Sequence, residues 1–286
     1  MSTIEKAISK FRKGPAAPSS QTQKTARFPR NSGSAEEGRA KYRSEDADIC
    51  LPWHELMRKG ILVPEEGRSS VAEEMRTIKH PLLKNVSHSN GNDAQNLIMI
   101  TSSVPGEGKS YTSVNMAISI AMEFDKTALL VDADVARPSI AGYLGFEPRK
   151  GLVDYLIEDN LDLSELLLKT DLPSLSVLPA GRQHHHSSEL LASENMKRLL
   201  VELANRYHDR IVIFDSPPLL ATSEAKVLAN LVGQVVVVVE AEKTSELLLN
   251  EALSQIPNAN IVGLILNKSR IKSSSSQYGY HYYHDE

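Results

Sequence analysis

Cysteine is almost absent from this sequence, since the 286 residues include one, Cys50. A single thiol permits no disulfide within the chain and no metal site built from several cysteines. This scarcity fits a reducing compartment. Aromatic residues are also few, at 5% of the chain. Any clustering of the nine tyrosines is therefore informative.

Long hydrophobic runs are absent too. A membrane-spanning helix needs about 18 or more consecutive apolar residues, whereas the longest apolar runs here, such as residues 235–239, have the length of a strand. The first residues, MSTIEKAISKFRKG, lack the apolar core of a signal peptide. We therefore expect a cytoplasmic chain that does not cross a bilayer.

Charge is distributed unevenly. Residues 1–43 carry ten Lys/Arg and three Glu, so the rest of the chain must be acidic to give the total of −4. Residues 14–38 are rich in Pro, Ser, Gln and Gly and too poor in apolar groups to offset the entropy lost on ordering. We expect a basic, largely disordered arm over residues 1–45. Residues 3–13 form either a short amphipathic helix that docks on a partner or on anionic lipid, or a frayed end.

From Leu97 onward, short apolar runs alternate with stretches of helical periodicity. Most runs are continuously apolar, which is typical of strands buried on both faces of a parallel sheet. The sequence therefore predicts an α/β fold, with a doubly wound, mostly parallel sheet and helices on both faces. The predicted strands are NLIMIT, TALLVDAD, LSVLPA, RIVIFDSP, QVVVVVEA and NIVGLILNKS, and the predicted helices are 110–123, 161–169, 188–207, 223–231 and 244–254.

The first predicted strand leads into SSVPGEGKSYT. Residues 103–110 fit the phosphate-binding loop G-x-x-x-x-G-K-[ST] of P-loop NTPases, except that Ser103 replaces the first glycine. The two later glycines let successive N–H groups face phosphate oxygens, and the following helix adds its positive dipole end. Tyr111 is expected to pack on the first helical turn and not to accept phosphate. The predicted ATP-binding residues of this loop are Val104, Pro105, Gly106, Glu107, Gly108, Lys109, Ser110 and Tyr111.

Three aspartates follow predicted strands. Asp132 and Asp134 end LLVDAD, and Asp215 ends RIVIFD. In an open α/β sheet the ligand crevice lies beyond the carboxyl ends of the strands, so we expect these carboxylates to face the phosphate loop. Ser110, Asp132 and Asp215 would hold Mg²⁺. Lys109, Asp132 and Asp134 are the predicted catalytic residues, with Asp132 as the base; Asp134 supports the base or the metal, or only caps a turn.

These motifs resemble those of the bacterial tyrosine kinases (BY-kinases) of capsule and exopolysaccharide assembly. SVPGEGKS, LLVDADVAR and IVIFDSPP match the Walker A, Walker A′ and Walker B motifs of that family in order and spacing. The resemblance covers about three quarters of the chain, from about Ser70 to its end. VDADVARPS and the basic arm look most like the autokinases associated with exosortase-linked exopolysaccharide systems.

The resemblance implies an ATP- and Mg²⁺-dependent kinase that phosphorylates its own carboxyl-terminal tyrosines in a neighbouring subunit. The matching acceptors are Tyr278, Tyr280, Tyr282 and Tyr283, in a Ser- and Gly-containing tail of residues 271–286. It also implies a ring-shaped homo-oligomer, a membrane chain-length-determinant protein as activator and a tyrosine phosphatase. That membrane partner would hold the kinase at the inner face of the membrane. We expect no nucleic-acid partner.

The family forms rings through a helix with the pattern E-x-x-R-x-x-R. Residues 73–79 offer Glu73, Arg76 and Lys79 for oligomerisation, although an ordinary solvated helix has the same appearance. This helix falls in a helical lead-in over residues 46–95, before a kinase domain over residues 96–270. A second departure is Ala136 in place of an arginine of the family, so Arg137 either takes over that nucleotide-binding role or the role is absent. Asn267 is expected to read adenine.

Other functions remain open at this level. Partitioning-type ATPases use a lysine where this loop has Val104, which excludes their mechanism, and iron–sulfur carrier ATPases need paired cysteines. An ATP-switch adaptor without kinase activity fits the same nucleotide site, and the tyrosine tail could serve only for interaction. The run His184, His185 and His186 lacks partners at ligand spacing, so we expect no metal there.

Overall fold

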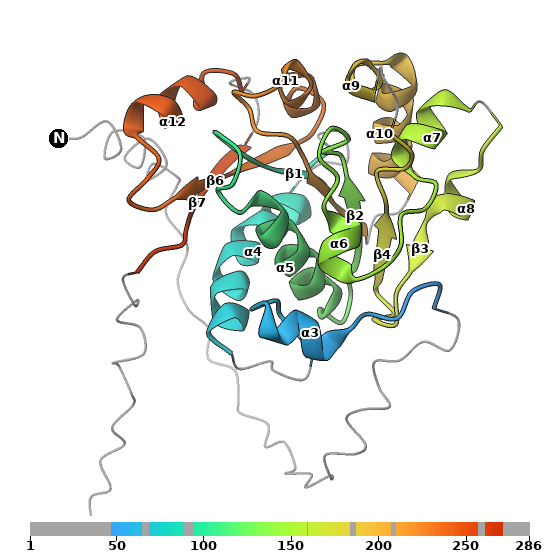
Figure 1. Ribbon diagram of the computed structural model, residues 1–286, viewed down its shortest axis with the longest axis horizontal. Helices are drawn as coiled ribbons and strands as arrows, with labels where there is room; N and C mark the ends of the chain where they lie inside the picture. Colours follow the sequence, from blue (N-terminus) through green and yellow to red (C-terminus); the bar gives the residue numbers. More distant parts are fainter. Residues whose placement is uncertain are drawn as a thin grey trace, which may run out of the picture. The chain divides into compact units, whose positions relative to one another are not determined.

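A seven-stranded sheet forms the centre of the fold (Figure 1). The computed structural model describes residues 47–64, 69–88, 94–158, 160–183, 187–206, 210–256 and 261–270. The strand order is β3-β4-β2-β5-β1-β6-β7, and every pairing is parallel except β3 with β4. The strands are β1 Leu97–Ser102, β2 Thr127–Asp132, β3 Leu168–Lys169, β4 Leu175–Leu178, β5 Arg210–Asp215, β6 Gln234–Glu240 and β7 Ile261–Asn267.

Both faces of this sheet are covered. Successive side chains of a strand point to opposite faces, so Ile98 and Ile100 of β1 enter one apolar cluster while Leu97 and Met99 enter the other. The helices within residues 53–144 pack in the first cluster, and those within residues 152–253 pack in the second. The predicted doubly wound, mostly parallel sheet is confirmed, because all six predicted strands are present.

The helices differ from the prediction within residues 161–169 and 188–207, and two short helices, Ile140–Leu144 and Leu152–Ile157, were not predicted. Residues 161–169 are not one helix, because Leu168 leaves the helical path and pairs with Val177 of β4. Residues 188–207 contain a break, where the Ser193 hydroxyl accepts the Met196 N–H and starts a new helix. The helices are α3 Trp53–Arg58, α4 Ser70–His88, α5 Lys109–Ala121, α6 Ile140–Leu144, α7 Leu152–Ile157, α8 Leu163–Leu166, α9 Ser187–Leu190, α10 Glu194–Arg206, α11 Ser223–Ala229 and α12 Glu246–Leu253.

The segment before the sheet, residues 47–63, is fastened to it by polar contacts. The two carboxylate oxygens of Asp171 accept the Leu51 N–H at 3.1 Å and the Trp53 indole N–H at 2.8 Å. Farther along, the Leu62 N–H donates to the side chain of Asn115 in α5 at 2.7 Å. The lead-in therefore belongs to the folded unit, with α3 lying below α4 and α5 in Figure 1.

None of the helices in the described part of the chain is long and apolar enough to span a membrane. The basic arm, the histidine run and the tyrosine tail lie outside the described residues.

Candidate nucleotide site

The phosphate loop lies where the strand order reverses. Strand β1 is flanked by β5 and β6, so the loop after β1 stands at the carboxyl ends of strands that continue in both directions. Asp132 at the end of β2 is the register partner of Asp215 at the end of β5. This topology brings the three predicted motifs to one edge of the sheet, which is the position expected for a ligand crevice.

Two glycines shape the loop. Gly106 and Gly108 have φ values of 92° and 103°, a region that residues with a Cβ rarely adopt. A Cβ on Gly108 would also lie 2.0 Å from Nδ2 of Asn267. Gly108 is the N-cap of α5, so the loop delivers the first N–H groups of that helix to the crevice.

Lys109 is held by two of the acids. Its Nζ lies 2.6 Å from Oδ2 of Asp134 and 3.9 Å from Oδ1 of Asp215. Burial works to lower the pKa of Lys109, but the charges of Asp215 and Asp134 outweigh it and raise that pKa. The lysine is therefore a fixed cation directed at the crevice.

Asp215 is fully buried at the foot of the site. Its Oδ1 accepts the Ser113 hydroxyl at 3.2 Å, and its Oδ2 accepts the Ser139 hydroxyl at 3.4 Å. Burial raises the pKa of Asp215, and Lys109 and the Ser110 hydroxyl counteract part of that rise. This carboxylate is thus oriented by hydroxyl groups on both of its oxygens.

Asp132 has one satisfied and one unsatisfied oxygen. Oδ2 accepts the N–H groups of Ser139 and Ile140, each at 3.0 Å, whereas Oδ1 is buried without a protein partner. Burial, followed by the charge of Asp215, raises the pKa of Asp132 to about 7. A carboxylate with a free oxygen and a pKa near neutrality is suited to accept a proton or to approach a metal.

These donors fit a magnesium ion bound with nucleotide. Mg²⁺ prefers oxygen ligands and is usually held by one or two carboxylates together with substrate phosphates. Asp132, Asp215 and the Ser110 hydroxyl supply such oxygens at one place. The described residues contain no cluster of three or more His, Cys, Asp or Glu that could hold a metal ion.

The comparisons with known proteins identify the family of this chain. A family model described as an AAA domain matches residues 95–262. The tyrosine-protein kinase YwqD of Bacillus subtilis is 31% identical over 79% of this chain and 92% of its own length. The chain belongs to the bacterial tyrosine-kinase family, the tyrosine autokinases of capsule and exopolysaccharide systems.

Two further likenesses support that membership. The kinase domain of the Escherichia coli tyrosine kinase ETK superposes with a TM-score of 0.64 at 26% identity, covering 88% of this chain and 99% of that domain. The succinoglycan biosynthesis transport protein ExoP of Rhizobium meliloti is 33% identical over 81% of this chain but only 29% of its own length. This tyrosine kinase therefore corresponds to one part of that longer protein.

Three other predicted nucleotide-binding residues, Arg137, Asn267 and Tyr111, each form a hydrogen bond within the protein. Arg137 is exposed and donates its backbone N–H to Asp134 at 3.2 Å. The Asn267 amide donates to the Glu107 carbonyl at 2.8 Å, so it braces the phosphate loop of the kinase. The Tyr111 hydroxyl donates to the Gly60 carbonyl at 2.6 Å, which places this ring against the lead-in segment.

The proposed oligomerisation residues do not lie on one free face of α4. Glu73 and Arg76 are exposed and form an ion pair with each other. Lys79 does not extend this exposed pair, because its side chain is buried. Lys79 Nζ donates to the Ser119 carbonyl at 2.8 Å and forms an ion pair with Glu123. At six positions beyond Glu73, the helix has turned this lysine toward α5.

Sequence reasoning missed several supporting residues of the kinase site. Ser113 and Ser139 orient Asp215, and Lys268 donates to the Gly106 carbonyl at 2.7 Å. Glu107 was assigned to nucleotide binding, but its side chain is buried inside the loop. A serine one turn after the phosphate-loop lysine is a signal that could have indicated Ser113, whereas no local pattern indicates the others.

Proposed function

We propose that this kinase transfers the terminal phosphoryl group of ATP to tyrosines of its own tail in a neighbouring subunit. The acceptors would be Tyr278, Tyr280, Tyr282 and Tyr283. The observation that carries the proposal is the convergence of Lys109, Asp134, Asp132 and Asp215 beside the phosphate loop, with Oδ1 of Asp132 buried and unpartnered.

Each residue has a role that follows from its position. Lys109 and the loop N–H groups stabilise negative charge on the transferred group. Ser110 and Asp215 would hold Mg²⁺, and Asp132 would contribute to that binding. Asp132 also accepts the proton of the tyrosine hydroxyl, and Asp134 positions Lys109. ATP with Mg²⁺ supplies an activated phosphoryl group whose charge the metal partly neutralises.

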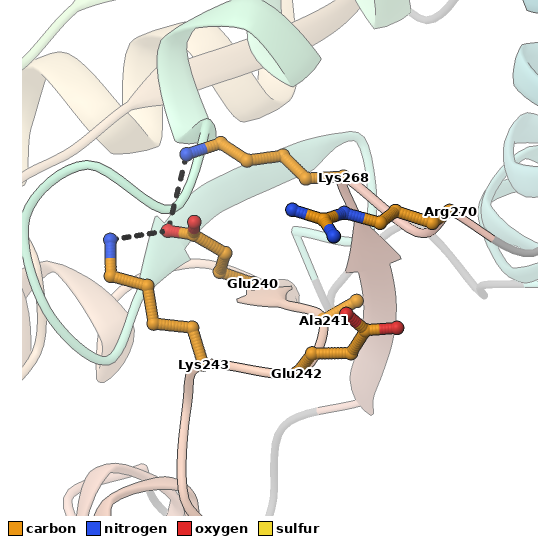
Figure 2. Close-up of a pocket in the computed structure, with 6 residues that line it drawn as sticks. All are labelled: Glu240, Ala241, Glu242, Lys243, Lys268 and Arg270. Atoms are coloured by element: carbon orange, nitrogen blue, oxygen red, sulfur yellow. Dashed lines mark hydrogen bonds and ion pairs between the residues drawn. The ribbon is translucent and has the colours of Figure 1, made fainter.

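We propose that the nucleoside binds at the carboxyl ends of β6 and β7. A pocket of about 380 Å³ opens there, lined by Glu240, Ala241, Glu242, Lys243, Lys268 and Arg270 (Figure 2). Asn267 precedes Lys268 and already contacts the phosphate loop. Adenine recognition by Asn267 is part of this proposal, with Tyr111 and Arg137 at the periphery of the site.

The tail is long enough to reach a second subunit. Tyr282 is twelve positions after Arg270, so the extended chain between them spans about 40 Å. The described chain ends beside its own phosphate loop, because Lys268 donates to Gly106. Distance alone therefore permits transfer within one subunit too, and the preference for a neighbour depends on how subunits assemble.

We propose a ring-shaped homo-oligomer that uses Glu73 and Arg76. We also propose activation at the inner face of the membrane by a chain-length-determinant protein and reversal by a tyrosine phosphatase. ExoP, in which the matching region is 29% of the chain, supports a functional link between such a kinase and a larger transport protein. Placement in an exosortase-linked system rests on VDADVARPS and the basic arm.

A mixing experiment tests the transfer. One protein carries Lys109→Met with an intact tail, and the other is active but has the four tail tyrosines replaced by phenylalanine. Mass spectrometry after incubation with ATP and Mg²⁺ should find phosphate on the tail of the Lys109→Met protein only in the mixture. If wild type binds ATP yet never gains phosphate, the ATP-switch adaptor replaces this proposal.

A further inference from the structure

Glu107 is a buried carboxylate inside the phosphate loop. Its side chain lies between the loop and the segment that follows β6, and the residue is 1% exposed. Burying a charge is costly unless donors surround it, and three donors do so here. One is the Val104 N–H, within the loop, at 2.8 Å from Oε2.

The other two donors belong to a different part of the chain. The Glu240 N–H donates to Oε1 of Glu107 at 3.3 Å, and the Thr244 hydroxyl donates to the same oxygen. Glu240 is the last residue of β6, and Thr244 lies in the connection from β6 to α12. A single side chain thus joins the phosphate loop to a segment more than 130 positions later.

The main chain of the loop is held from the same side. The Asn267 amide donates to the Glu107 carbonyl, and Lys268 Nζ donates to the Gly106 carbonyl. Lys268 also forms an ion pair with Glu240, which Lys243 shares (Figure 2). The loop is therefore bound through carbonyls and a carboxylate, which leaves N–H groups of Gly106 to Ser110 for phosphate.

We propose that Glu107 is a positioning residue for nucleotide binding, which fixes the phosphate loop through its bond with Thr244. The carboxylate does not contact phosphate. Its contribution is to hold the loop in a shape that phosphate oxygens recognise, so the loop loses less conformational freedom when nucleotide binds. The proposal rests on the nucleotide site described above.

Thr244→Val tests the link, because it removes the hydroxyl with little change in volume and leaves Glu107 with its two backbone donors. Losing one hydrogen bond to a charged group should raise the Kd of a fluorescent ATP analogue by about 3–10-fold. It should raise the KM for ATP similarly while kcat stays within about twofold, since the contact is the same before and during transfer. Thr244→Ser should restore both constants.

Ser245→Ala is the matched control. Ser245 caps α12 by accepting the Leu248 N–H, so its loss lowers Tm without touching Glu107. A Kd that is unchanged in Ser245→Ala and raised in Thr244→Val supports the proposal. Equal Kd values for Thr244→Val and wild type overturn it, as does an equal rise in both variants. Failure of wild type to bind the analogue would refute the nucleotide site itself.

Glu107→Gln completes a double-mutant cycle with Thr244→Val. If the two side chains act through each other, Thr244→Val should have less effect on Kd in the Glu107→Gln background than in wild type. Additive effects in the double variant would contradict the proposed link.

Discussion

Lys109 and Asp134 form an ion pair of 2.6 Å between the phosphate loop and the segment after β2. In the proposed mechanism the same ammonium group contacts phosphate oxygens when nucleotide binds, so Asp134 and phosphate would compete for it. The acid therefore both directs the lysine into the crevice and opposes its transfer to the ligand.

Replacing Asp134 by asparagine should separate these two effects. The neutral side chain keeps the shape but weakens its hold on Lys109, so the Kd for ATP should fall by about twofold or more. Autophosphorylation should slow by at least about tenfold, because the lysine is less well positioned. Titration calorimetry with ATP and Mg²⁺, together with single-turnover phosphorylation, measures both. Lys109→Met should lose both properties, and weaker ATP binding by Asp134→Asn would contradict the competition.

The raised pKa of Asp132 predicts how the stability of the folded protein depends on pH. Burial raises its pKa in the folded protein from 3.8 to about 7. Between these values the folded state binds a proton that the unfolded chain has released. The free energy of unfolding should therefore fall as pH rises, by up to about 1.4 kcal/mol per unit, and level off above pH 7. Asp132→Asn should remove this contribution. Urea unfolding from pH 5 to 8, without nucleotide or Mg²⁺, checks it; parallel curves for the two proteins would count against it.

Two basic residues of α4, Arg76 and Lys79, should behave differently when they are replaced. Lys79→Met removes a buried hydrogen bond to Ser119 and the ion pair with Glu123, so it should lower stability by about 1–3 kcal/mol. Arg76→Ala removes an exposed ion pair and should change stability by less than about 0.5 kcal/mol. Light scattering should nevertheless show a smaller assembly for Arg76→Ala. An unchanged assembly size would show that Arg76 does not contribute to the proposed interface between subunits.

Trp53 reports on the attachment of the lead-in segment. It is the only tryptophan, and its indole donates to Asp171 at 2.8 Å. Asp171→Asn should weaken this bond and the bond from Leu51, and lower stability by about 1–3 kcal/mol. Trp53 fluorescence followed during unfolding should shift to lower urea in that variant. The unfolding midpoint measured by circular dichroism should shift by the same amount. A fluorescence change at lower urea than the loss of the helical signal would show that the lead-in segment detaches by itself.

Much of the fold could be predicted because parallel strands leave a strong signal. The run from Val235 to Val239 is buried on both faces. The sequence predicted a strand at each of the six apolar runs, and each run contains one. Strand β3 was missed because two residues, Leu168 and Lys169, carry no period of their own. Their pairing with β4 is a tertiary effect that overrides local helical preference.

Some residues of the candidate site could likewise be predicted from the sequence, and others could not. The positions of Lys109, Asp132 and Asp215 follow from motifs at strand ends, which a sequence displays. The inward turn of Lys79 and the bond between Glu107 and Thr244 depend on which face of a helix or loop meets the rest of the fold. Charged side chains usually favour solvent, so their burial could not be predicted without the neighbours that satisfy them.

The contacts of Asp171 with Leu51 and Trp53 join positions about 120 residues apart. A shortened chain that starts at residue 95, where the AAA match begins, would retain the whole phosphate loop and all three aspartates. It would also lose α3 and α4, whose buried residues share one apolar cluster with α5, and so expose part of that cluster. Such a chain should aggregate, so catalytic motifs alone are a poor guide to where this enzyme can be cut.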